Sequence, residues 1–138
     1  MMPAKILWIM GSLIPMIIGI MHLRGTLFTK LLHPTDKSVM QVMKTTKLEV
    51  DKNALVWKAW VGFNSLFSVC LAFMGVSNAY LAYHHFYLLE GPTFLSISAI
   101  VVLVLLVLIS YKYLIKPVVI VFLLTFILYL LSIFTSLH

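Results

Sequence analysis

The sequence predicts an all-α integral membrane protein: an antiparallel bundle of four transmembrane helices with a short amphipathic helix in one connection. Of the 138 residues, 62% are hydrophobic and only 10% are charged, whereas a soluble domain carries about 25% charged residues. Four apolar stretches are long enough to cross the ~30 Å hydrocarbon layer of a bilayer. All four acidic residues lie in the connections between these stretches. Spans and short connections use up the length, so we expect one domain over residues 1–138.

The first span is expected over residues 4–24. Gly11, Pro15 and Gly19 recur every four residues, which predicts a small face where another helix approaches closely. A signal peptide is the competing interpretation, but no cleavage site of the A-x-A type follows the apolar run. We therefore expect an uncleaved span.

Residues 25–53 form the only long hydrophilic connection. Pro34-Thr35-Asp36 predicts a helix start, with Thr35 or Asp36 as the N-cap. A mainly apolar set of residues then shares one arc of a helix, and a polar set lies away from it: Val39, Val42, Met43, Thr46 and Val50 against Lys37, Gln41, Lys44 and Lys52. Such a helix is typical of a segment in an anionic headgroup layer. A helix packed over the ends of the spans remains an equal alternative.

The second span is expected over residues 54–82. Small residues step along it by three and four, which predicts a seam for helix packing: Ser65, Ser68, Ala72, Gly75, Ala79 and Ala82. Asn64, Ser68 and Asn78 lie on an adjoining stripe. We interpret Cys70, the lone cysteine, as a packing residue without reactivity.

The third and fourth spans are expected over residues 93–110 and 117–135. Glu90-Gly91-Pro92 breaks the chain before the third span, and the stretch from Tyr111 to Pro117 is expected to be a tight turn. A turn this short makes the two spans antiparallel neighbours.

Basic residues crowd into the first and third connections: Arg24, Lys30, Lys37, Lys44, Lys47 and Lys52 in the first, Lys112 and Lys116 in the third. In a four-span chain these connections share a side, and the opposite side has only Lys5. The positive-inside rule predicts a cytoplasmic long connection and both termini outside. Aromatic residues are expected to mark the inner interface (Trp57, Trp60, Tyr111, Tyr113) and the outer one (Trp8, Tyr80, Tyr83, Tyr87). The net charge of +6 therefore reflects orientation, and no nucleic-acid partner is expected.

His22, Arg24, Asn64 and Ser68 are the candidate ligand-binding residues. His22 ends the first span and Asn64 begins the second, so both would lie near the cytoplasmic face. Polar groups at membrane depth usually face a bundle interior, so His22 and Asn64 could line one polar pocket that holds a lipid headgroup or an anion. The structural alternative is that Asn64 is interhelical glue, His22 an interfacial residue and Arg24 a positive-inside anchor. We favour the structural alternative over this functional interpretation.

Three further histidines, His84, His85 and His138, belong to the outer half of the predicted topology. A haem or metal held by His84 or His85 with His138 is geometrically open, but we favour the interpretation that these are interfacial histidines and a frayed terminus. A haem between His22 and His84 would need ligands at opposite ends of the bundle. We therefore expect no cofactor and keep haem as an alternative.

Several mechanisms lack the residues that they need. No carboxylate lies within a span, which disfavours proton-coupled export by a small four-span transporter. No phosphate-binding glycine loop, serine triad, carboxylate pair or zinc spacing is present. We expect no enzymatic activity.

The segment Trp57-Lys58-Ala59-Trp60-Val61-Gly62-Phe63-Asn64 resembles the W-x-x-W-x-G-F-N segment of a group of uncharacterised small bacterial four-span membrane proteins. These proteins tend to have a histidine late in the first span, here His22. The resemblance covers about the first 80 residues and implies four spans in the bacterial cytoplasmic (inner) membrane, but no activity. The topology is also loosely similar to that of DoxX-like proteins.

Three functions follow as hypotheses. The first is a membrane protein that binds a lipid, an apolar ligand or the spans of a partner. The second is a haem- or metal-binding accessory subunit of an electron-transfer complex. The third is an oligomeric channel or transporter. Membrane lipids, other membrane subunits or further copies of the chain are the expected partners.

Overall fold

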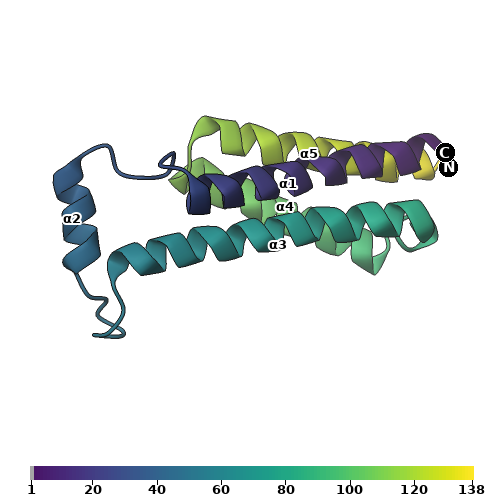
Figure 1. Cartoon of the computed structure of the whole chain (residues 1–138). Coiled ribbons are helices and arrows are strands. Elements are labelled where there is room, and N and C mark those ends of the chain that lie inside the picture. The colour runs from purple at the N-terminus through teal and green to yellow at the C-terminus, as the bar shows by residue number, and fades with distance from the viewer. Residues whose placement is uncertain (1) are drawn as a thin grey trace. The chain divides into compact units, whose positions relative to one another are not determined.

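The computed structural model describes residues 2–138, which form helices and connections without a β-strand. The elements are α1 (Met2–Phe28), α2 (Lys37–Thr45), α3 (Val56–His84), the 3-10 helix η1 (Phe86–Leu88), α4 (Phe94–Tyr113) and α5 (Lys116–Ser136) (Figure 1). Helices α1, α3, α4 and α5 are long and apolar enough to cross a membrane. The predicted all-α, multi-pass membrane architecture is confirmed.

The chain folds as two compact units, and α1 and α3 each contribute to both. One unit contains the chain up to residue 17 together with residues 72–138, and the other contains residues 18–71. We call them the bundle unit and the loop unit and describe each by itself.

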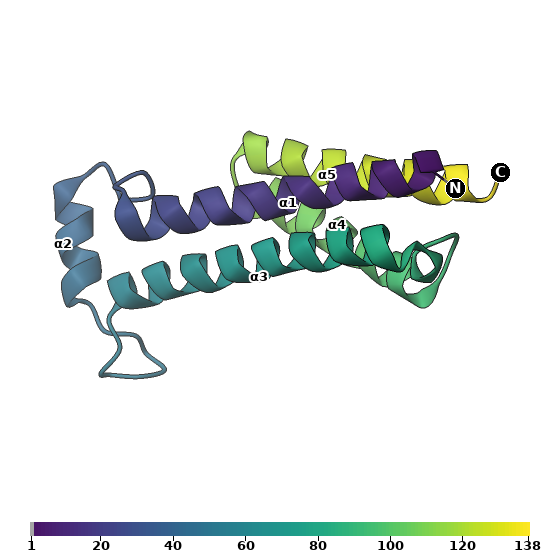
Figure 2. The same ribbon diagram turned by 45° about the vertical axis from the view of Figure 1, so that its right-hand side comes forward.

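In the bundle unit, α4 and α5 are antiparallel neighbours joined at Leu114 and Ile115 (Figures 1 and 2). Pro117 lies in the first turn of α5, where a missing amide hydrogen costs no helical hydrogen bond. The predicted turn over Tyr111 to Pro117 is too long, because α4 continues through Tyr113. A basic residue in this last turn, Lys112, favours that continuation because a cation stabilises a helix C-terminus.

The connection between α3 and α4 turns at Gly91. Its φ of +68° is a conformation that glycine adopts without steric cost. Thr93 then caps α4, since its hydroxyl accepts a hydrogen bond from the amide of Ser96 at 3.2 Å. The Gly91 amide donates to Ser136 Oγ at 2.9 Å, which ties this turn to the end of α5.

Gly75 brings α3 against the backbone of α1 within the bundle unit. A Cβ atom on Gly75 would lie 2.5 Å from the backbone nitrogen of Met16 and 2.6 Å from the carbonyl oxygen of Ser12. The predicted small-residue seam is therefore a close helix crossing at this position, because only hydrogen fits there.

In the loop unit, α2 lies crosswise to the end of α1 and the start of α3 (Figure 2). Asp36, one of the two predicted candidates, is its N-cap. Its carboxylate accepts hydrogen bonds from the Ser38 amide at 2.7 Å and the Ser38 hydroxyl at 2.8 Å. The predicted continuation of this helix past residue 45 is wrong. Residues 46–55 fold back on themselves instead, with the Val56 amide donating to Thr46 and the Leu48 amide to Ala54.

Replacing Gly75 by alanine is expected to destabilise the protein. The new methyl group meets backbone atoms that cannot rotate away, and overpacking of this kind costs about 1–3 kcal/mol. Gly62→Ala is the matched control on the same helix, since a Cβ there has nothing within 4 Å and gains up to ~1 kcal/mol of helix propensity. Unfolding in micelles measures both variants. Equal stability of the two would contradict the close crossing.

The N-cap of α2 is expected to titrate at low pH. Hydrogen bonds from Ser38, first from its hydroxyl and then from its amide, hold the pKa of the Asp36 carboxyl below its ordinary value. The ionised carboxylate therefore stabilises α2 fully at pH values above the ordinary pKa. This stabilisation is lost as the pH falls through the lowered pKa. The amide proton shift of Ser38 should follow this titration with a midpoint below 3.8. Asp36→Asn should abolish it, and a midpoint above 3.8 would contradict the cap.

Candidate functional site

His22 of α1 and Asn64 of α3 meet in the loop unit. His22 Nε2 lies 3.2 Å from Asn64 Oδ1, and the Asn64 side-chain nitrogen donates to the carbonyl oxygen of Trp60 at 2.8 Å. Because a carbonyl oxygen only accepts, Nε2 carries the proton and donates. The predicted proximity of His22 and Asn64 therefore holds, and the pair fixes which imidazole nitrogen is protonated.

The other imidazole nitrogen of His22 makes no hydrogen bond within residues 2–138. His22 also packs edge-on against the ring of Phe67, with ring centroids 6.1 Å apart. Asn64 and Phe67 together restrict the imidazole, since one holds Nε2 and the other contacts the ring. Nδ1 is thus the polar atom of this side chain that remains for a ligand.

His22 lines a groove of about 200 Å³ in the loop unit. The other lining residues are apolar or glycine: Ile18, Met21, Gly25, Leu31 and Leu32. Met21 is 63% exposed and Leu31 is 80% exposed, so the rim is reached from outside the protein. Pockets that hold whole drug-sized ligands have about 300–1,000 Å³. This groove has room for part of a larger amphipathic molecule.

Of the four predicted ligand-binding residues, His22 lines this groove, whereas Asn64, Arg24 and Ser68 do not. Arg24 is exposed and makes no ion pair or hydrogen bond within the part of the chain described. Ser68 is fully buried, and its hydroxyl donates to the carbonyl oxygen of Asn64 at 2.6 Å. The structure brings His22 and Asn64 together, and Ser68 lies one turn after Asn64 on the same helix.

The outer histidines lie in the bundle unit and pack on aromatic side chains. His84 and His85 pack among tyrosines, with His84 4.8 Å from the ring of Tyr80, whereas His138 packs on Phe134 at 5.0 Å. Among the described residues, no three His, Cys, Asp or Glu side chains gather as a metal-binding group.

A buried polar and aromatic cluster in the bundle unit was not predicted. Trp8 is fully buried and stacks on Tyr129 with ring centroids 4.0 Å apart, while its indole nitrogen donates to Asn78 Oδ1 at 3.2 Å. Ser12 Oγ donates to the Trp8 carbonyl oxygen and lies 2.8 Å from Tyr129 Oη. Since the Ser12 proton is engaged, Tyr129 is the donor to Ser12.

This cluster corrects the prediction that Trp8 marks the outer interface. Trp8 lies one turn before Ser12 on the buried face of α1, and its polar atom has a partner within the protein. Trp8, Ser12 and Pro15 follow one another at helical spacing and are all buried. This spacing could have predicted that Trp8 faces the interior. Cys70 departs from its prediction too, because it is exposed and is no internal packing residue.

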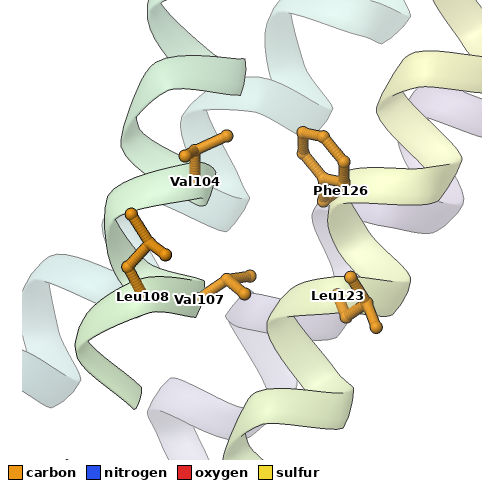
Figure 3. Close-up of a pocket in the computed structure, with 5 residues that line it drawn as sticks. All are labelled: Val104, Val107, Leu108, Leu123 and Phe126. Atoms are coloured by element: carbon orange, nitrogen blue, oxygen red, sulfur yellow. The ribbon is translucent and has the colours of Figure 1, made fainter. Parts of the chain in front are cut away.

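A second, smaller hollow lies between α4 and α5 in the bundle unit. Val104, Val107 and Leu108 face Leu123 and Phe126 across about 90 Å³ (Figure 3). No polar side chain lines it, so it offers no group that could orient a ligand. We regard it as a surface notch between two apolar helices.

Tyr129→Phe is expected to destabilise the bundle modestly. The substitution removes the hydroxyl that donates to Ser12 but keeps the ring stacked on Trp8, and such bonds in membrane helices are worth about 0.6 kcal/mol on average. Tyr80→Phe is the matched control because Tyr80 is 56% exposed. Unfolding in micelles measures both, and a loss that is no larger for Tyr129→Phe would contradict the hydrogen bond.

Comparisons with protein families, curated proteins and solved structures found no family model, curated protein or solved structure that matches this chain. The resemblance of the Trp57–Asn64 segment to small bacterial four-span proteins therefore stays a prediction.

Proposed function

We propose that this chain is a non-enzymatic membrane protein that binds a phospholipid in the groove beside His22. The observation that carries the proposal is the His22–Asn64 hydrogen bond, which holds one imidazole at the wall of an otherwise apolar groove. A single oriented polar group among apolar walls is the usual composition of a ligand site.

The groove chemistry favours a lipid over a small apolar molecule. Ile18, Met21 and Leu32 offer aliphatic contacts for acyl chains, whereas His22 offers one nitrogen to a headgroup. A phosphate oxygen accepts a hydrogen bond from a protonated imidazole, and a headgroup hydroxyl or ammonium donates to a neutral one. Because Met21 and Leu31 are exposed, a bilayer lipid can enter sideways without leaving the membrane.

We further propose that the groove lies near the cytoplasmic face of a bacterial inner membrane, with both termini outside. The support is the distribution of charge along the sequence, since basic residues crowd the first and third connections and such connections remain in the cytoplasm. Exposed Tyr111 and Tyr113 beside the third connection suit an interfacial aromatic belt.

His22→Ala is expected to lower the amount of phospholipid that stays bound to the purified protein. A hydrogen bond to a charged group contributes about 1.5–3 kcal/mol, so occupancy should fall about tenfold or more at limiting lipid. The measurement is native mass spectrometry after exchange into detergent with phosphatidylethanolamine and phosphatidylglycerol as probes.

The matched control is His33→Ala. His33 lies in the same unit and packs against the ring of Trp57 at 4.8 Å, but it does not line the groove. It should retain lipid as the unmodified chain does. Equal lipid occupancy in the two histidine variants would contradict the proposed site.

The volume of the groove is tested by two substitutions at Gly25. A Cβ at this position would only touch Leu31 Cδ2 at 3.7 Å, so Gly25→Ala should keep the bound lipid. Gly25→Leu places a larger side chain in the groove and should displace it. If Gly25→Leu retains lipid as Gly25→Ala does, the lipid is bound elsewhere.

A further inference from the structure

Helix α2 has an apolar arc that the rest of the described chain covers only in part. Val39, Met40, Val42 and Met43 fall on one side of the helix at 100° per residue, whereas Lys37, Gln41 and Lys44 fall on the other. None of its residues is buried, and Val39 and Val42 are 46% and 60% exposed. Met40 and Met43 are half-buried, so the arc lacks a complete partner within residues 2–138.

A helix this short needs that partner. Isolated helices below about 12–15 residues are marginal in water, and α2 has nine. The Asp36 cap contributes to its first turn, and internal packing buries none of its residues fully. We infer that an apolar surrounding outside the chain stabilises α2.

The charge around α2 identifies the chemistry of that surrounding. Residues 24–52 carry six basic and three acidic side chains, a net charge of +3. All three acidic groups are engaged. Asp36 caps α2, and Asp51 accepts a hydrogen bond from the Asn53 amide at 2.8 Å. Glu49 pairs with Lys52 at 2.8 Å. Lys37, Lys44 and Lys47 have no acidic partner within the described residues, so an anionic surface would complement them.

The position of α2 in the loop unit identifies the occupant. Short connections over residues 29–36 and 46–55 join it to α1 and α3, which are both candidate membrane spans. It lies crosswise to them (Figure 2), so it runs along a membrane plane when the spans cross that membrane. Every copy of the protein would therefore have α2 at the headgroup layer of its membrane. This layer offers both an apolar boundary and charged groups.

We propose that α2 docks in the headgroup layer of the chain's own membrane and binds anionic phospholipids through Lys37 and Lys44. The apolar arc inserts at the boundary with the acyl chains, and the lysines at its edge contact lipid phosphates. The proposal is independent of the His22 groove, because no residue of α2 lines that groove.

Hydrogen exchange of the α2 backbone amides tests the docking. The full chain is placed in nanodiscs of phosphatidylcholine alone or of phosphatidylcholine with phosphatidylglycerol. We expect stronger protection of α2 in the anionic discs, and a loss of the difference at high salt because salt screens exposed charges. Equal protection in the two kinds of disc would overturn the proposal.

The double substitution Lys37→Gln with Lys44→Gln should lower this protection in anionic discs. Each lysine near an anionic surface should account for about fivefold, and glutamine keeps a similar helix propensity. Lys112→Gln with Lys116→Gln is the matched control in the α4–α5 connection and should leave α2 protection unchanged. If both double variants behave like the unmodified chain, the lysines of α2 bind no anionic lipid.

Two further results separate the alternatives. Val39→Ser with Val42→Ser should expose α2 in both kinds of disc, while unchanged protection of α3 shows that the spans remain folded. Protection that rises with the number of chains per disc would assign the arc to a second copy and overturn lipid docking. His22→Ala should leave α2 protection intact, so failure of the groove and failure of the docking are distinguished.

Discussion

This structure depends on one constraint: polar groups inside an apolar span must find hydrogen-bond partners within the protein. Span hydroxyls meet it locally, as when Thr26 donates to the carbonyl oxygen of His22 and Thr125 to that of Val121. The side-chain amide of an asparagine has more polar atoms than its own helix can satisfy. Its remaining polar atom therefore forms a hydrogen bond with a side chain of another helix. Asn64 bonds to Trp60 and His22, and Asn78 to Met74 and Trp8. Unpaired, each group would cost several kcal/mol in hydrocarbon.

This demand also explains why the two asparagines of α3 have different consequences. Asn78 is satisfied by Trp8, which is fully buried, so that pair closes a packed interior. Asn64 is satisfied by His22, whose ring has a second nitrogen and lines an open groove. The same amide chemistry therefore stabilises helix packing in the bundle unit and orients an imidazole that lines a groove in the loop unit. Ser65 Oγ is the buried exception without a partner among the described residues, and we have no physical account of it.

Local signals in the sequence predicted the architecture well because they act over a few residues. Asp36 as a cap, Pro117 at a helix start and Gly91 at a break each depend on backbone chemistry that the residue itself carries. The His22–Asn64 pair could also be predicted, since two polar residues near the same ends of adjacent spans have few other partners. Trp8 and Cys70 were misjudged because the lipid-facing and buried sides of an all-apolar helix have nearly the same composition. The end of α2 was missed because residues 46–55 pair with each other through backbone hydrogen bonds, which side-chain periodicity does not report.

The central claim is that the His22–Asn64 pair orients an imidazole toward a bound lipid. A high-resolution experimental structure of the full chain in a phosphatidylglycerol-containing bilayer tests it most directly. The account predicts lipid density in the groove beside Ile18, Met21 and Leu32, with a headgroup atom within hydrogen-bonding distance of His22 Nδ1. An empty groove, or one closed by a protein side chain against His22, would contradict it.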